Sequence, residues 1–128
     1  MGKSPVRYLL DSVIVIDHFN GIAAATQFLQ DHGAECALSV ITRAEVLVGF
    51  TDDTEALAME FLDAFPALPV TREIADQAAR LRRSQRWRLP DAIQAAIALS
   101  SDLVLVTRNT RDFHDGDGGL AVLEPYRL

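Results

Sequence analysis

The sequence predicts a single α/β domain in which a central parallel sheet of about four or five strands is flanked by helices. Short apolar segments alternate along the chain with longer segments whose apolar residues recur at helical spacing. Strands separated by helices pair in parallel, because a parallel pair needs a crossover that a helix usually supplies. The 128 residues, 49% of them hydrophobic, are enough for one core, and no repeat or linker divides them. We therefore expect one domain over residues 1–128.

The strands are predicted from short apolar runs that end at polar or turn-forming residues. The first run stops at Asp11, and the run over residues 103–107 is almost wholly apolar, as in a strand buried on both faces. The run at residues 68–70 is the weakest of the set. The expected strands are residues 6–10, 36–40, 68–70, 103–107 and 121–123.

The helices are predicted from apolar periodicity together with residues typical of helix starts and stops. Ser12 is expected to cap the first helix and Thr71 the fifth, and Pro90 suits the first position of the last one. The glycine-rich residues 115–119 are expected to form a surface turn. The expected helices are residues 12–20, 23–30, 42–49, 54–65, 71–81 and 91–100.

The composition excludes several classes of function. With 18 acidic and 12 basic side chains the formal charge is −6, so any contact with nucleic acid must be local rather than a bulk attraction. No apolar run reaches about 18 residues and the first residues lack a secretory signal, so we expect a cytoplasmic protein without membrane contact. The single cysteine, Cys36, excludes a disulfide within the chain and a cysteine-based zinc site. Metal binding is therefore expected to use oxygen ligands.

Carboxylate and amide side chains lie at the positions where an open parallel sheet usually carries its site. Such sites form outside the carboxyl ends of the strands. Asp11 follows the first predicted strand, and Glu45 lies in the helix after the second. Asp91 opens the helix before the fourth strand, and Asn109 and Asp112 follow that strand. We expect these residues to meet at one edge of the sheet.

Each of these residues also has a purely structural interpretation. Asp11 and Asp91 suit helix starts, Thr42-x-x-Glu45 is a capping-box pattern, and the two residues after the fourth strand are common in turns. A cluster of acids, however, could not stay ionised without a cation. Mg²⁺ and Mn²⁺ take oxygen ligands, and such an ion can acidify a bound water that attacks a phosphodiester. The combination therefore predicts hydrolysis of nucleic acid.

Four motifs follow one another in order along nearly the whole chain. They are LLDS at residues 9–12, SVITRAE at 39–45, LPDAIQAAIA at 89–98 and VTRNTRDF at 106–113. Together they resemble the PIN-domain ribonucleases, and among these the VapC-type toxins of bacterial toxin–antitoxin pairs. The resemblance implies a PIN-like α/β fold over residues 1–128.

The resemblance also implies a role for each residue at the predicted edge. Asn109 falls on the family's fourth acidic position, where aspartate or asparagine is seen, and because it is uncharged we expect one ion rather than two. The implied catalytic residues are Asp11, Glu45, Asp91 and Asp112, of which the first three bind the metal, and the implied supporting residues are Ser12, Thr107 and Asn109.

The implied activity is that of an endoribonuclease dependent on Mg²⁺, or on Mn²⁺, acting on structured RNAs such as transfer RNA. The implied assembly is a homodimer inhibited by a VapB-like antitoxin. Asn109 keeps a second interpretation open, in which the chain is a catalytically silent PIN-fold module that binds RNA or antitoxin. A phosphate-accepting signalling domain is disfavoured, because it needs a lysine near the far strand and the only lysine is Lys3.

One basic cluster stands out in this acidic chain. It either holds RNA phosphates, since arginine forks match phosphate oxygens, or forms a solvated helix end or a patch for an acidic antitoxin segment. Trp87, within it, either stacks on a base or packs in the core. The predicted RNA-binding residues are Arg80, Arg82, Arg83, Arg86 and Arg88.

Overall fold

Five parallel strands form the central sheet of the computed structural model, which describes residues 5–128. Every neighbouring pair is parallel, and the strand order is β3-β2-β1-β4-β5. The predicted α/β class, with a parallel sheet of four or five strands, is therefore confirmed. The strands are β1 (Tyr8–Leu10), β2 (Cys36–Ser39), β3 (Ala67–Leu68), β4 (Val104–Val106) and β5 (Val122–Leu123).

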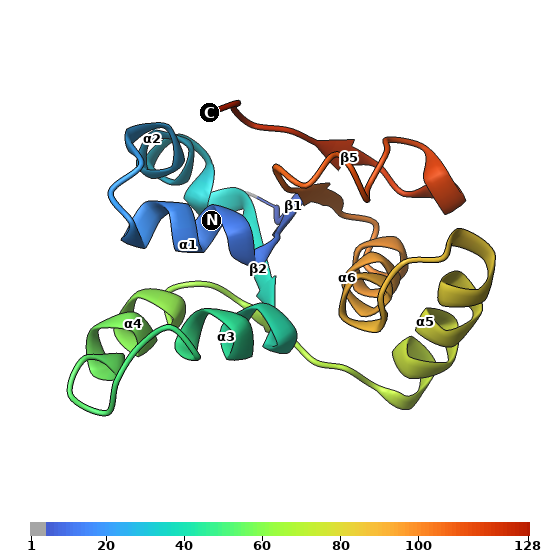
Figure 1. The fold of residues 1–128 in the computed structure, drawn as a ribbon, viewed down its shortest axis with the longest axis horizontal. Coiled ribbons are helices and arrows are strands. Elements are labelled where there is room, and N and C mark those ends of the chain that lie inside the picture. The colour runs from blue at the N-terminus through green and yellow to red at the C-terminus, as the bar shows by residue number, and fades with distance from the viewer. Residues whose placement is uncertain (1–4) are drawn as a thin grey trace.

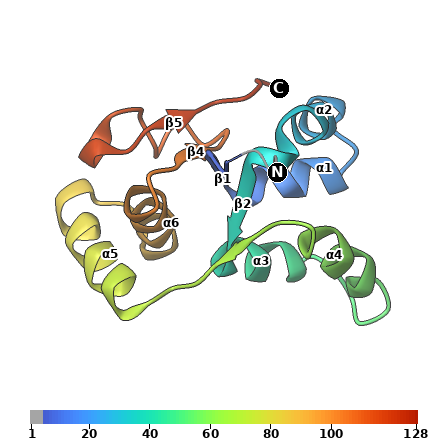
Figure 2. The same cartoon turned by 180° about the vertical axis from the view of Figure 1, so that it is seen from behind.

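Helices cover both faces of this sheet. Figures 1 and 2 show α5 and α6 on one side of it and α1 to α4 on the other. The α-helices are α1 (Ser12–Phe19), α2 (Ala23–His32), α3 (Val40–Leu47), α4 (Glu55–Leu62), α5 (Arg72–Gln85) and α6 (Leu89–Ser100), and two short 3₁₀ turns are η1 (Gly33–Glu35) and η2 (Asp117–Gly119).

Consecutive residues of β1 show how the sheet separates two apolar cores. Leu9 and Leu10 are both 0% exposed, but Leu9 packs with residues of α5 and α6, whereas Leu10 packs with residues of α1 and α3. Successive side chains of a strand point to opposite faces, so one apolar run supplies both cores. Each such leucine contributes about 1.5–3 kcal/mol by leaving water. A strand buried on both faces reads as a continuous apolar run, which is why these strands were predictable.

The observed strands are shorter than the predicted ones, mainly at their ends. The predicted strand over residues 6–10 begins at Tyr8, although Arg7 still pairs through its backbone with Glu35 and Val104. The weakest predicted strand, residues 68–70, is displaced to Ala67–Leu68 at the sheet edge. Edge positions have one partner strand only, so the pairing pattern there is weakly specified by sequence.

The predicted cap of α1 and the predicted start of α3 were both placed too late in the chain. Asp11, rather than Ser12, is the N-cap of α1, because its carboxylate accepts a hydrogen bond from the backbone N–H of Ser12 at 2.9 Å. Ser39 caps α3, so this helix begins at Val40 and not at Thr42. Asp11 directly follows β1 and Ser39 is the last residue of β2, so both helices begin without an intervening loop. The predicted cap at Thr71 is confirmed, since its hydroxyl accepts from the N–H of Ile74 at 3.2 Å.

The predicted surface turn near the end of the chain contains the short 3₁₀ turn η2. Gly116 and Gly119 have φ angles of +94° and +85°, a region that favours glycine. Among residues 5–128, none of the helices is both long and apolar enough to cross a bilayer.

Candidate active site

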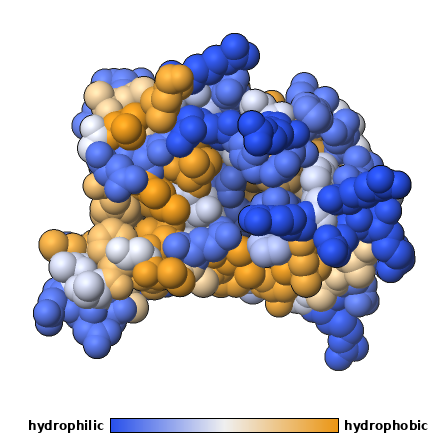
Figure 3. Space-filling view, in the orientation of Figure 1, coloured by the Kyte–Doolittle hydropathy of each residue, from blue (hydrophilic) through white to orange (hydrophobic). Residues whose placement is uncertain are grey.

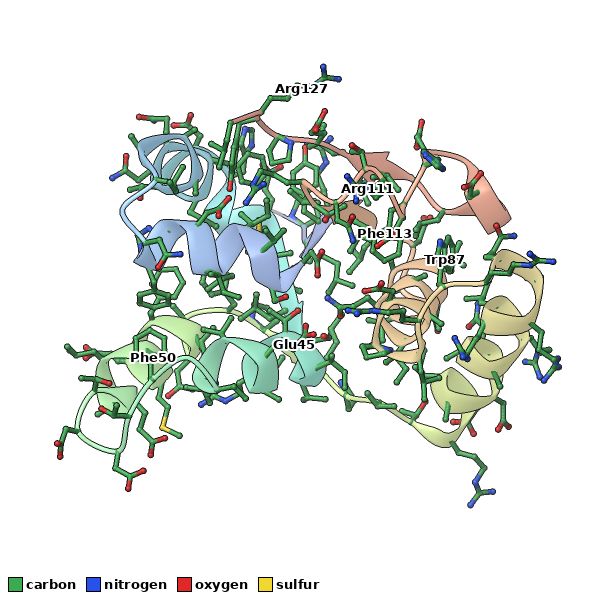
Figure 4. All side chains as sticks on the ribbon, viewed as in Figure 1. Glu45, Phe50, Trp87, Arg111, Phe113 and Arg127 are labelled. Carbon is green, nitrogen blue, oxygen red and sulfur yellow. The ribbon has the colours of Figure 1, made fainter. Side chains whose placement is uncertain are left out.

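Four chain segments bring the candidate residues toward the carboxyl edge of the sheet. The helices α1 and α3 start directly after β1 and β2, and a loop follows β4. Because these strands are parallel, the three exits lie on the same edge. The N-terminus of α6 supplies the fourth segment. Figure 4 shows Glu45 on α3 and Arg111 on the loop after β4.

Asp11 is held in place at this edge by two neighbours. One carboxylate oxygen accepts the Ser12 N–H, and the other accepts the hydroxyl of Thr107 at 2.7 Å. Asp11 is 8% exposed and its own N–H donates to Val106 at 2.9 Å, which extends the pairing of β1 with β4 by one residue. A nearly buried carboxylate with two donors has a fixed orientation.

Thr107 connects Asp11 to the loop after β4. Its hydroxyl is fully buried and accepts the backbone N–H of Asn109 at 2.9 Å while donating to Asp11. The side-chain amide of Asn109 in turn donates to a carboxylate oxygen of Asp112 at 3.0 Å. The residues predicted to support the site on this loop are thus linked to Asp11 by a continuous chain of hydrogen bonds.

Asp91 is the third residue of α6 and carries the strongest electrostatic signature of the site. Its pKa is raised from an ordinary 3.8 to about 6, first by burial and then by the negative charge of Asp11. The charges of Asp112 and Glu45 raise the pKa of Asp91 further, while the cation of Arg88 lowers it. Only like charges that lie near one another act in this way. The structure therefore brings Asp11, Asp112 and Glu45 within electrostatic range of Asp91.

Glu45 lies on the exposed side of α3. The capping-box interpretation is wrong for this residue, because Ser39 and not Thr42 is the N-cap of the helix. Thr42 instead lies inside the helix, where its own N–H is bonded to Ser39. Glu45 lines a depression of about 220 Å³ between α1 and the end of α3, together with Ile16, Phe19, Asn20, Val46, Gly49 and Phe50.

The chemistry of these side chains fits a hard divalent cation. Within residues 5–128, no three His, Cys, Asp or Glu side chains are placed to hold one ion together as they stand. The acids nevertheless repel one another around Asp91, which a cation would relieve. Carboxylate oxygens are the ligands that Mg²⁺ and Mn²⁺ prefer. The residues that would hold such an ion are Asp11, Glu45 and Asp91.

A buried polar network beneath the site was not predicted from the sequence. Gln94, one turn after Asp91 in α6, donates to the hydroxyl of Thr42 at 2.8 Å and accepts from Ser39. Thr42 also donates to the carbonyl of Leu10 at 3.2 Å. The network ties α6 to the strand–helix junctions on which Asp11 and Glu45 depend. A glutamine within the apolar run of α6 was the signal that could have revealed it.

A second unpredicted group joins α1, the loop after β4 and the C-terminal segment. Asp17 is 5% exposed and accepts two hydrogen bonds from Arg108, at 2.6 and 2.9 Å, and one from the Tyr126 hydroxyl at 2.8 Å. The hydrogen bond from Arg108 is the main reason that the pKa of Asp17 lies below its ordinary value. Arg108 is the neighbour of Thr107, so this group fixes the loop at the site. The sequence feature that could have revealed this group is an acidic residue, Asp17, within the largely apolar helix α1.

The predicted RNA-binding arginines occupy the end of α5 and the segment that leads to α6, and all five are exposed. Arg88 is the N-cap of α6, and its charge acts on Asp91. Arg82 donates to the carbonyl of Trp87 at 2.8 Å, which closes the turn after α5. Only Arg88 of this cluster is therefore shown to act on the acids.

Trp87 packs in the core, which confirms the packing interpretation over base stacking. The side chain is 5% exposed, its ring centre lies 5.4 Å from that of Phe113, and its N–H donates to the carbonyl of Asp112 at 2.8 Å. The two rings are labelled in Figure 4. Trp87 thus anchors the end of the loop that carries Asn109 and Asp112.

Comparisons with known proteins agree with this fold and with the four motifs. The family model for the PIN domain matches residues 8–118. Ribonuclease VapC19 of Mycobacterium tuberculosis is 34% identical over 113 residues, which cover 82% of this chain and 90% of the relative. Ribonuclease VapC10 of the same species is also 34% identical, over 82% of this chain and 84% of its own.

Solved structures give the same result. A chain of a toxin–antitoxin complex from Klebsiella pneumoniae superposes with a TM-score of 0.86 at 36% identity, covering 94% of this chain and 99% of that chain. A chain of DNA-bound VapBC from Salmonella typhimurium superposes with a TM-score of 0.80 over 94% and 99% of the two chains, at 20% identity, which supports the fold alone. With a family model that spans most of its length, this chain belongs to the PIN domain family.

Proposed function

We propose that this protein is a VapC-type endoribonuclease that hydrolyses RNA phosphodiester bonds with Mg²⁺, or Mn²⁺, held by Asp11, Glu45 and Asp91. Asp112 is proposed as a further catalytic residue. The observation that carries the proposal is the raised pKa of Asp91, at about 6, in the presence of three other carboxylates. Clusters of acids with shifted pKa values are typical of catalytic sites. The ribonuclease names of relatives that are 34% identical support the same activity.

The residues of this chain supply positioning around the acids. Each Asp11 oxygen accepts one hydrogen bond, from Ser12 or Thr107, and a carboxylate oxygen has two lone pairs, so both oxygens retain one for a ligand. The amide of Asn109 orients Asp112 in the same way. When bound, the cation supplies charge neutralisation, an acidified water and polarisation of the phosphodiester.

The proposal is tested by RNA cleavage in Mg²⁺ or Mn²⁺, with EDTA as the negative condition. We expect Asp11→Asn and Asp91→Asn to abolish cleavage and to weaken Mn²⁺ binding measured by calorimetry, while circular dichroism stays unchanged. Asp53→Asn, at an exposed position in the turn before α4, is the matched control and should keep both properties. Cleavage that persists in EDTA, or in both site variants, would contradict the proposal.

The alternative is a catalytically silent PIN-fold module that binds RNA or antitoxin. It is favoured by two observations, namely Asn109 at the family's fourth acidic position and the absence of three preassembled ligands among residues 5–128. The same assay separates the two functions, because the silent module binds without cleaving at any Mg²⁺ or Mn²⁺ concentration.

The proposed partner that controls the enzyme is a VapB-like antitoxin. The chain from Klebsiella pneumoniae that is 36% identical belongs to a toxin–antitoxin complex. Figure 3 shows apolar surface gathered over α3 and α4, where Val48 is 85% and Leu57 72% exposed. An exposed apolar patch of this kind suits a protein partner. Co-expression with a short neighbouring reading frame should yield a stable complex that no longer cleaves RNA.

The remaining elements of the proposal concern the substrate and the assembly. The substrate is proposed to be a structured RNA such as transfer RNA, cut in the cytoplasm by a homodimer. Cleavage mapping on total RNA after induced expression identifies the substrate, and sedimentation equilibrium measures the assembly. Growth arrest on expression, relieved by Asp11→Asn, is expected of a toxin, whereas normal growth with soluble wild-type protein would contradict that role.

A further inference from the structure

A second depression, of about 570 Å³, opens beside the acids and is lined by Val13, Arg108, Asn109, Thr110 and Arg111. We propose that it binds a phosphate group of the RNA strand next to the cleaved bond, with Arg111 as the principal cationic contact. The inference rests on the proposed function and names a residue that would hold the RNA substrate beside the proposed catalytic acids.

The position of the depression follows from the chain around it. Val13 lies two residues after Asp11, and residues 108–111 follow Thr107, whose hydroxyl donates to Asp11. The wall therefore shares Asn109 with the chain of hydrogen bonds that links Asp11 to Asp112. The volume is in the range of known small-ligand sites of roughly 300–1,000 Å³, which accommodates a nucleotide unit.

The two arginines of the depression differ in their charge balance. Arg108 is paired with Asp17 through two hydrogen bonds, so its charge is compensated within the protein. Arg111 is exposed and forms no ion pair with any residue of the described part of the chain. A guanidinium donates through several N–H groups in a fork that matches phosphate oxygens. Arg111 is thus the cation available to a ligand.

The loop that carries Arg111 is ordered before any ligand binds. The N–H of Thr110 donates to the carbonyl of Arg108 at 2.9 Å, and the N–H of Phe113 donates to that of Asn109 at 3.1 Å. Phe113 is 0% exposed and packs against Trp87, while Asp17 holds the other end of the loop through Arg108. Binding to a preorganised loop avoids the entropic cost of ordering it.

The proposed phosphate contact lies on a different segment from the predicted arginine cluster. Arg88 acts on Asp91 from the start of α6, whereas Arg111 comes from the loop after β4. Arg88 therefore acts on Asp91 from one segment, and Arg111 is carried by the loop that also supplies Asn109 and Asp112. In a chain with a formal charge of −6, a few local cations must carry most of the RNA contact.

The test compares the salt dependence of RNA binding between Arg111→Gln and the wild type. The probes are a fluorescein-labelled, mixed-sequence single-stranded RNA and bulk transfer RNA, in EDTA so that no cleavage occurs. Removing one phosphate contact should lower the slope of log Kd against log salt by about 0.7 and weaken low-salt binding several-fold. Arg111→Lys should restore the slope but not the full affinity, because lysine keeps the charge and loses the fork.

The matched control is Arg7→Gln, which removes one arginine just before β1, at the opposite edge of the sheet. It should bind RNA with the wild-type slope. An unchanged slope for Arg111→Gln, or no measurable binding by the wild type at low salt, would overturn the inference. RNA cleavage by the wild type in Mg²⁺ is measured in a separate assay. Cleavage together with an unchanged slope for Arg111→Gln would refute the phosphate contact and leave the proposed function intact.

Discussion

Replacing Asp91 by asparagine should stabilise the metal-free protein at neutral pH. The folded-state pKa of Asp91, about 6, lies above its ordinary 3.8, so the folded protein binds the proton more tightly than the unfolded chain does. The resulting stabilisation is complete below pH 3.8 and is lost as the pH rises through about 6. Above that pH the ionised carboxylate destabilises the fold. Asparagine carries no charge at this pH, so the variant does not lose the stability that ionisation of Asp91 costs the wild type.

The magnitude follows from the shift and from two corrections. A rise of about 2 pKa units corresponds to about 3 kcal/mol, as an upper bound. Asp91 is partly exposed, so solvent screening reduces this figure. The positive end of α6 favours the ionised form by a further 0.3–1 kcal/mol, roughly, which also reduces the gain. We expect Asp91→Asn to raise the free energy of unfolding by about 1 kcal/mol at pH 7.5.

The assay is urea unfolding in EDTA at pH 7.5 and at about pH 3. A gain of about 1 kcal/mol moves the midpoint by about 0.5 M at pH 7.5, and the difference should nearly vanish at about pH 3, where Asp91 is mostly protonated in both the folded and the unfolded state. Adding Mg²⁺ at pH 7.5 should stabilise the wild type and not the variant. A variant that is no more stable than the wild type at pH 7.5 would refute the reasoning, with Asp53→Asn as the control.

Three further substitutions test the surroundings of the site. Thr107→Val removes the donor to Asp11 at nearly constant shape, and Mn²⁺ affinity measured by calorimetry should fall about 10-fold. Asp17→Asn weakens the pair with Arg108 and should cost about 2–3 kcal/mol in urea unfolding near pH 7. Because the pKa of Asp17 is lowered, this loss should shrink as the pH falls below 3.8. Gln94→Ala removes one hydrogen bond from each of the buried hydroxyls of Ser39 and Thr42 and should lower the thermal midpoint through a loss of about 2 kcal/mol.

Local chemistry explains most of what the sequence alone could predict. Thr71 caps its helix because the acceptor and donor are three residues apart, and β1 is predictable because an apolar run needs no information from elsewhere. Whether Asp11 or Ser12 caps α1 depends on a contact with a residue that is distant in the sequence. The N–H of Asp11 is taken by Val106, which keeps Asp11 in the sheet and makes it the residue that precedes the helix.

Long-range contacts explain what the sequence could not show. The hydrogen bonds that hold Asp17 reach across 91 residues to Arg108 and 109 residues to Tyr126, so no spacing rule predicts them. Asp11 and Asp112 could be proposed from the sequence because they follow strands, and Asp91 because it lies in the first turn of a helix; the parallel topology places those ends at one edge. Glu45 lies within α3 and has no such end position. Buried polar residues that support the site from the middle of a helix do not lie at element ends, so the sequence marks them only by their polarity.

The electrostatic cost at Asp91 is unusual in a structure whose other polar groups are well paired. Among residues 5–128, every buried side-chain nitrogen and oxygen has a hydrogen-bond partner. Even Asp17, 5% exposed, is paired with Arg108, whereas the pKa of Asp91 is raised first by burial and then by the nearby charges of other acids, Asp11 foremost. Because the chain satisfies its buried groups elsewhere, poor packing does not account for this repulsion. If the proposed site binds a divalent cation, relief of this repulsion would contribute to the affinity for the ion.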